Sequence, residues 1–207
     1  MSPSKAEKKV DVLPANFIFS PDDPFYSGPV TCDLMHIKPA SYVAATVEFV
    51  VMLIGAIAFY KFYEVNQSLD KWMLVSMLGL LAVSVFTSII LAYGIITEQA
   101  NLIRTKISFI QIVILILMTL AFVSITAMSV GIEMTNSLFG LFVKVAEMER
   151  DFGPLWPFNI GVVAFFTAAL AIWMHAIYKG VYDFLLDKDY FSNAPSIELA
   201  KSLPREE

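Results

Sequence analysis

The side chain with the most unusual setting in this sequence is Glu48, which lies inside the apolar run of residues 41–60. An ionised side chain near the centre of a membrane-spanning helix costs roughly 2.5–3.5 kcal/mol, whereas each Leu, Ile, Phe or Val favours insertion by roughly 0.3–0.6 kcal/mol. The run contains nine residues of these four types, which together offset about one carboxylate. The helix can therefore insert with Glu48 in place, and we expect the carboxyl group to be buried against a polar partner.

Polar side chains from three further apolar runs are expected near the level of Glu48. Because a helix rises 1.5 Å per residue, Glu48 lies about 10 Å and Gln111 about 6 Å from the end at which their runs begin. The run between them crosses in the opposite direction and brings Thr87 and Ser88 to a comparable depth, while His175 lies closer to the same membrane surface. We expect Glu48 to be hydrogen-bonded to Gln111 or to a hydroxyl, with burial favouring the neutral carboxyl.

Three interpretations of this polar layer remain open. It could be a structural clasp within a helix bundle, a docking point for a membrane partner that supplies a basic or polar group, or a relay for protons or cations. A transporter would also call for paired ionisable groups, helices broken at midspan or an internal repeat, and we identify none of these in the sequence. The relay is therefore the least supported of the three.

The residue types used in catalysis are sparse in this chain. There are two histidines, His36 and His175, and one cysteine, Cys32, which are too few for the usual zinc sites and allow no intrachain disulfide. We find no glycine-rich phosphate loop, no serine elbow and no carboxylate pair at helical spacing within a run. The sequence thus predicts no enzyme, no catalytic residues, no metal site and no cofactor.

The composition indicates a membrane protein. The chain is 57% hydrophobic and 16% charged, with a mean hydropathy of +0.69, whereas soluble domains are about 45–50% apolar and about 25% charged. Its net charge of −5 makes nucleic acid an improbable partner. Four apolar runs are long enough to span a membrane as helices, and we place them at residues 41–60, 72–97, 107–132 and 155–178.

The basic residues around these runs predict the orientation of the chain. Ten lysines and arginines fall on the side of the N-terminus and four on the other side, and the more basic side is normally cytoplasmic. We therefore expect an all-α membrane protein, a four-transmembrane-helix bundle with cytosolic N- and C-termini. A proline-rich segment (1–40) would precede the bundle (41–178), and a cytosolic tail (179–207) would follow it.

Two further patterns concern packing. Residues 134–152 form a luminal amphipathic segment, with apolar residues at helical spacing from Leu138 to Met148, expected as one interfacial helix or as a continuation of the third span. Small residues recur every four positions at Ser84 and Ser88 and at Ala164 and Ala168, where they would let helix backbones approach closely. These small-residue faces could serve the bundle itself or a partner.

Two stretches suggest a family. "CDLMHIKPASYVAA" leads into the first run, and "AIWMHAIYKGVYDFLLDKDYF" closes the fourth. With four spans and cytosolic ends, they resemble the lysosomal-associated transmembrane protein family, especially its divergent nematode-type members. The chain departs from the family in having a single cysteine in this region, Pro39 where Thr or Gly is usual, and no Pro-Pro-x-Tyr motif in the tail. The positions that match the family are Cys32, His36 and Lys38 in the first stretch and Tyr178, Lys179, Leu185 and Lys188 in the second.

The resemblance implies a multi-pass protein of the endomembrane system, endolysosomal or in the endoplasmic reticulum, that binds and sorts other membrane proteins or lipids. Recruitment of a ubiquitin ligase, which needs the missing motif, is not carried over. Tyr182 and Leu185 fit a tyrosine-based sorting signal. We expect an accessory subunit or sorting adaptor within a larger complex of integral membrane proteins and bound lipids; the alternative is a small lipid- or ion-handling protein that uses the polar layer around Glu48.

Overall fold

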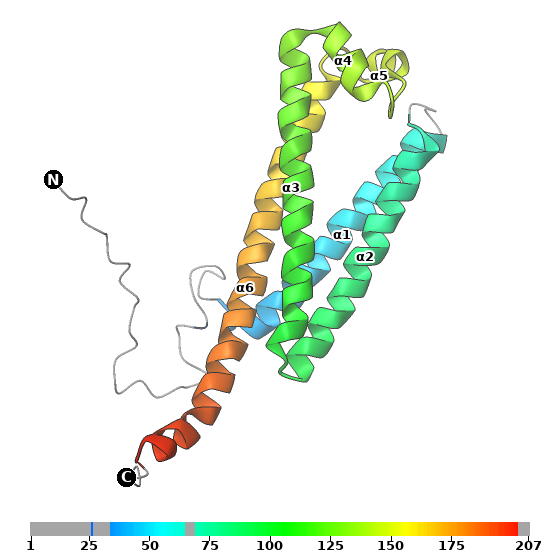
Figure 1. The fold of residues 1–207 in the computed structure, drawn as a ribbon. Helices are drawn as coiled ribbons and strands as arrows, with labels where there is room; N and C mark the ends of the chain where they lie inside the picture. The colour runs from blue at the N-terminus through cyan, green and yellow to red at the C-terminus, as the bar shows by residue number, and fades with distance from the viewer. Residues whose placement is uncertain (1–25, 27–33, 65–68, 203–207) are drawn as a thin grey trace, which may run out of the picture.

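The described part of the chain is entirely helical apart from its turns. The computed structural model describes Tyr26, residues 34–64 and residues 69–202, with side chains described as far as residue 190. Cys32 lies outside the described residues. Within them the chain forms six helices (Figure 1): α1 (Ile37–Glu64), α2 (Lys71–Ile96), α3 (Ala100–Val130), α4 (Ile132–Phe139), α5 (Val145–Phe152) and α6 (Trp156–Ser202).

Four of these helices are long and apolar enough to cross a membrane, namely α1, α2, α3 and the first 35 residues of α6. A spanning helix needs about 20 residues, and α1 alone has 28. Only 17–33% of the most apolar 18-residue window of each helix is buried inside the protein, so most of the apolar surface faces outward. This confirms the predicted all-α fold with four helices long and apolar enough to span a membrane.

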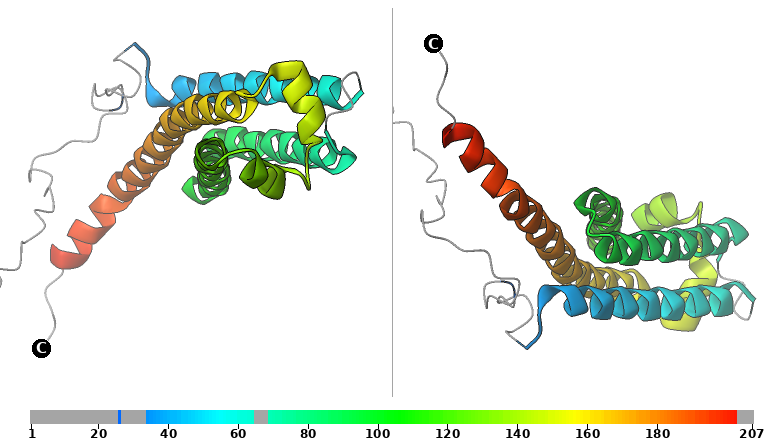
Figure 2. Two further views of the ribbon diagram at one scale, coloured as in Figure 1. Left: turned by 90° about the horizontal axis from the view of Figure 1, so that it is seen from above. Right: turned by 90° about the horizontal axis from the view of Figure 1, so that it is seen from below.

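The four long helices converge at one end of the molecule and diverge at the other. Near the α2–α3 turn, which contains Glu98, all four lie close together, and the larger hydrophobic core is built there from residues of all four, including Ala44, Leu91, Ile110 and Ile177. Towards the opposite end, α1 and α2 run together away from α3 and α6 (Figures 1 and 2). We call these two ends the Glu98 end and the α4–α5 end.

The most extensive helix pairing, between α3 and α6, depends on small residues. Ala164 and Ala168 are buried against α3, and a Cβ atom added at Gly161 would lie 3.2 Å from Cγ1 of Ile125. Such contacts are available only where side chains are small, because they bring helix backbones close together. The small residues singled out in the sequence thus pack within the bundle, and Ser84 of α2 is also fully buried.

The segment 134–152 differs from the single amphipathic helix predicted for it. It forms α4 and α5, which are separated by the turn of residues 140–144. Helix α4 ends where the Gly140 N–H donates to the Asn136 carbonyl, and the backbone that follows turns to meet the start of α2. The Asp70 N–H donates to the Phe142 carbonyl over 3.2 Å, and the pairing of Leu69 with Val143 forms an isolated β-bridge. Val145 and Met148 are buried as the pattern predicts, but Leu141 and Phe142 are exposed.

The fourth spanning helix is longer than the sequence predicts. We expected it to end at residue 178, but α6 continues without interruption to Ser202 and is 47 residues long. Gly180 lies within this helix, where it allows α6 to approach the start of α1 closely: a Cβ atom added at Gly180 would lie 2.9 Å from Cδ1 of Ile37. The first part of the predicted tail is therefore a helical extension of the bundle.

Candidate functional site: a buried charge cluster around Glu48

The carboxylate of Glu48 is buried against a lysine from another helix. Nζ of Lys106 on α3 lies 2.7 Å from Oε1 of Glu48 on α1, and the two side chains are 0% and 4% exposed. The charges of such a close pair compensate one another. This is the one ion pair between fully buried side chains in the part of the chain that the structure describes.

Both side chains make further hydrogen bonds within the same cluster. Ser84 Oγ donates to Glu48 Oε1 over 2.6 Å, and the Tyr178 hydroxyl donates to Oε2 over 2.9 Å. Lys106 Nζ also donates to Ser88 Oγ over 2.9 Å and, with longer geometry, to Thr87 Oγ1 over 3.4 Å. Each carboxylate oxygen therefore accepts at least one hydrogen bond, and the ammonium group is surrounded by oxygen acceptors. We call these six residues the charge cluster.

Each long helix contributes to the charge cluster. Glu48 lies about 16 Å along α1 from Ile37 at 1.5 Å per residue, and Lys106 lies about 9 Å along α3 from Ala100, so its long side chain reaches deeper into the bundle to meet the carboxylate. The Lys106 ammonium lies 5.6 Å from the ring centroid of Tyr178, within the range of a cation–π contact. The cluster joins α1, α2, α3 and α6 at one level, near the Glu98 end.

The energetics of a buried pair define what the charge cluster can do. Replacing both charges with apolar groups is often neutral or stabilising, whereas removing one partner costs about 3–5 kcal/mol because the other charge is left unpaired. The cluster therefore fixes how the four helices are positioned relative to one another and contributes little net stability. The hydrogen bonds among its members join the four long helices at this level.

The structure brings together only some of the residues predicted to share this layer. Thr87 and Ser88 contact Lys106 as members of the charge cluster. Gln111 and His175 do not join it: Gln111 Nε2 lies 3.1 Å from His175 Nε2 in a separate, more exposed pair between α3 and α6. Of the two kinds of partner expected for Glu48, Gln111 or a hydroxyl group, the structure has hydroxyl groups, those of Ser84 and Tyr178.

Three members of the charge cluster have roles that the sequence did not indicate. An apolar run that begins at residue 107 places Lys106 among the basic residues flanking the third span, but α3 begins at Ala100 and carries Lys106 inward. Ser84 was assigned to small-residue packing, and Tyr178 to the aromatic end of the fourth run. The signal that could have found Lys106 is an acidic and a basic residue placed at matching depths on two different spans.

The candidate sorting residues lie in a folded helix. Tyr182 and Leu185 are both within α6, where Leu185 is 1% exposed and Tyr182 packs against the core. Neither is presented on an extended peptide in this conformation. No three His, Cys, Asp or Glu side chains lie close enough to hold a metal ion in the portion of the chain with described side chains.

A second polar contact region lies at the Glu98 end, outside the apolar spans. Glu98 adopts a left-handed backbone conformation (φ 56°) in the α2–α3 turn, and its carboxylate forms ion pairs with Lys188 of α6 and, over 3.7 Å, with Lys38 of α1. The hydrogen bond from Lys188 holds the pKa of Glu98 below its ordinary value of 4.5. Nearby, the Tyr26 hydroxyl donates to Asp187 Oδ2 over 3.1 Å. These contacts tie the start of α1 and the α2–α3 turn to the extension of α6.

Comparison with known proteins gives one informative match. No protein-family model matches the chain, and no solved structure matches it. The chain is similar to "Protein cuti-1" of Caenorhabditis elegans, with 44% identity over 194 residues, covering 94% of this chain and 96% of that protein.

Proposed function

The chain belongs to the same family as protein cuti-1, and we propose that it is a non-enzymatic tetraspan membrane protein that acts as an accessory subunit or assembly adaptor for other membrane proteins. The observation that carries this proposal is the closed charge cluster. Glu48 finds its cation within its own chain, at Lys106, so its charge is compensated without a transported ion or a basic partner. The polar layer therefore holds the bundle together, and we place the binding of partners on the outer surfaces of the bundle.

The outer faces of the long helices support the same proposal. Large apolar side chains are more than half exposed on α2, α3 and α6, for example Phe86, Leu115 and Phe166. These faces provide apolar area for lipid and for the membrane-spanning helices of another protein. An adaptor needs such faces on helices that are themselves held together. The charge cluster provides the join, because it links all four helices at one level.

The orientation and compartment belong to the same proposal. With Lys106 removed from the flanking residues, since it is buried, the ratio of basic residues on the two sides becomes nine to four and still favours cytosolic termini. The Glu98 end would then face the cytosol, and the α4–α5 end would face the lumen or the exterior. An endolysosomal or endoplasmic-reticulum location rests on the resemblance to the lysosomal-associated transmembrane proteins.

The test is a purification of the tagged full-length protein from its native membrane in a lipid-retaining detergent, read by mass spectrometry and by size. We expect a stoichiometric integral membrane partner in a single large peak. The variant Glu48→Gln keeps the hydrogen-bonding shape but leaves Lys106 without its counter-charge, which costs stability. It is therefore scored on the fraction that elutes as a folded bundle, which should retain most of that partner.

The opposing outcome is equally concrete. A lone protein that carries reproducible lipid, together with loss of a pH-dependent transport activity in Glu48→Gln, would overturn the adaptor and place lipid or ion handling at the charge cluster. Gln111→Leu is the matched control, because it removes a polar group from α3, the helix that carries Lys106, without touching the charge cluster.

A further inference from the structure

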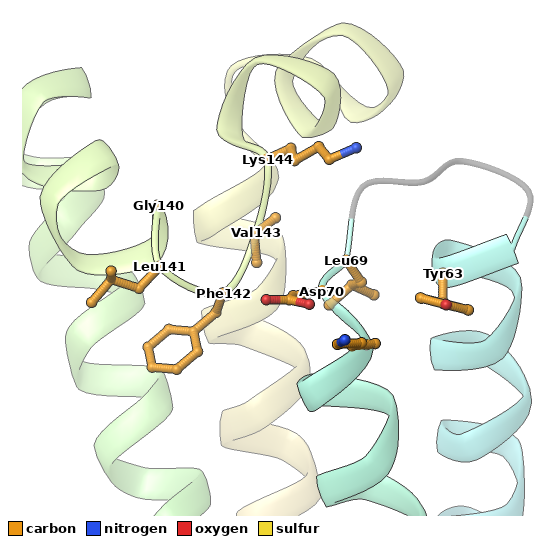
Figure 3. Close-up of a pocket in the computed structure, with 9 residues that line it drawn as sticks. Tyr63, Leu69, Asp70, Gly140, Leu141, Phe142, Val143 and Lys144 are labelled. Carbon is orange, nitrogen blue, oxygen red and sulfur yellow. The ribbon is translucent and has the colours of Figure 1, made fainter.

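A hollow opens at the α4–α5 end, between the end of α1, the start of α2 and the turn that separates α4 from α5 (Figure 3). Its volume is about 350 Å³, and its walls include Tyr63, Asp70, Lys71, Phe142 and Lys144. It is distinct from the charge cluster, which lies near the opposite end of the same helices. Its polar lining consists of two cations, one carboxylate and one phenol, and the proposed function uses none of them.

The walls of the hollow are fixed to one another by backbone contacts. The Asp70 N–H donates to the Phe142 carbonyl over 3.2 Å, and Leu69 pairs with Val143 in the β-bridge. Val143 is buried in the smaller hydrophobic core, beside Trp156 of α6. The two segments that enclose the hollow, about seventy residues apart in the sequence, are therefore held in one arrangement before any ligand arrives.

The position of the hollow matches the boundary of a membrane. It lies where α1 ends and α2 begins. Tyr63 belongs to its lining and Trp72 follows the lining residue Lys71, and both are exposed aromatic residues of the types that gather at the headgroup level. In Figure 3 the Lys144 side chain lies on the side away from the long helices, whereas Phe142 points along them. Leu141, next to Phe142, is 79% exposed. The lining is therefore polar towards water and apolar towards the bilayer.

The charges of the lining indicate the kind of molecule that it would bind. Lys71 and Lys144 can pair with a phosphate, and Lys144 is only loosely engaged by Glu147 at 3.7 Å. Asp70 caps α2 by position but makes no side-chain capping hydrogen bond, so its carboxylate can face a cationic group. A phosphate beside an ammonium, joined to apolar chains, meets all three features at once.

We propose that this hollow binds the headgroup of a zwitterionic membrane phospholipid, with its phosphate at Lys71 and Lys144 and its ammonium group at Asp70. The acyl chains lie along Leu141 and Phe142 towards the bilayer. The site is independent of the adaptor function, because it uses the opposite end of the bundle and exposed side chains.

The experiment is native mass spectrometry of the full chain in detergent, titrated with phosphatidylethanolamine. The double variant Lys71→Ala/Lys144→Ala should weaken binding at least tenfold, and the control Arg150→Ala, which removes an exposed cation of α5 that does not line the hollow, should change it less than twofold. Asp70→Asn should reduce the preference for phosphatidylethanolamine over anionic phosphatidylglycerol. These residues are exposed, so elution as a single peak verifies that the variants fold.

Three results would overturn the proposal. Equal binding by the double variant and the control would place the lipid elsewhere. Displacement of the lipid by millimolar inorganic phosphate would assign the hollow to a free anion, and an unchanged lipid preference in Asp70→Asn would remove the ammonium contact. If the double variant failed to fold, the single variant Lys144→Gln would carry the same test.

Discussion

Removal of Lys106 gives the sharpest test of the charge cluster. In Lys106→Met the side chain keeps its length and loses its charge, so Glu48 remains buried with the hydroxyls of Ser84 and Tyr178 but without a cation. Truncating one partner of a buried pair costs about 3–5 kcal/mol. For a chain of about 200 residues, each kcal/mol shifts the melting temperature by roughly 2–4 °C. We therefore expect Lys106→Met to melt roughly 6–20 °C below the natural protein.

The double variant Glu48→Leu/Lys106→Met distinguishes a coupled pair from two independent polar residues. Because replacing both members of a buried pair is often neutral or stabilising, we expect the double variant to regain most of the stability lost in Lys106→Met. The measurement is thermal unfolding in a fixed detergent, followed by the loss of the monomeric peak on size exclusion. Gln111→Leu provides the matched control, and we expect it to change stability little because its pair with His175 is exposed.

The refuting result is additivity. If the loss in the double variant equals the sum of the losses in Glu48→Leu and Lys106→Met, the two residues do not interact in the folded protein. The assignment of Lys106 as the internal cation would then be wrong, and a partner docking at Glu48 would return as an open interpretation.

Three further predictions concern single contacts. Tyr178→Phe removes one hydrogen bond to the Glu48 carboxylate and should lower stability by about 1.5–3 kcal/mol in the same melting assay. Gly161→Val places atoms where α3 and α6 are in contact and should separate the two helices, with increased protease cleavage between α3 and α6 as the readout. The hydrogen bond from Lys188 lowers the pKa of Glu98, so the stabilisation it provides is present above pH 4.5, the ordinary carboxyl value, and is lost as the pH falls through the lower folded-state value. Hydrogen exchange in the α2–α3 turn, compared at each pH with Glu98→Gln, should therefore approach that of the variant only at acidic pH.

The spans and the need for a partner at Glu48 were predictable, because both follow from the order of residues along the chain without knowledge of their neighbours in space. An apolar run of sufficient length forms a spanning helix wherever its neighbours lie, and a buried carboxylate requires hydrogen bonds whatever their source. The identity of the partner depends on the rotation of each helix about its axis, which the runs do not specify. Lys106 and Gln111 are five residues apart, and at about 100° per residue their side chains point about 140° apart on α3. Once Lys106 faces the bundle interior, Gln111 faces outward.

The break between α4 and α5 was unpredictable for a different reason. The apolar pattern from Leu138 to Met148 is compatible with one continuous helix, and Gly140 alone does not require a turn. The turn is selected by contacts with the start of α2, which lies about seventy residues earlier in the chain. Local pattern therefore predicted the burial of Val145 and Met148, while a long-range contact decided the exposure of Leu141 and Phe142.

The order in which the charge cluster is assembled has a consequence for biosynthesis. Glu48 precedes Lys106 by 58 residues and Tyr178 by 130 residues. At a synthesis rate of about 5–20 residues per second, α1 waits roughly 3–12 s for its cation and longer for its last hydroxyl. Throughout that interval the first helix carries an unpaired acidic group whose insertion cost is offset only by its own apolar residues, and the charge is compensated once α3 has emerged. A chain that ended before residue 106 would therefore lack the cation that compensates this carboxylate in the complete bundle.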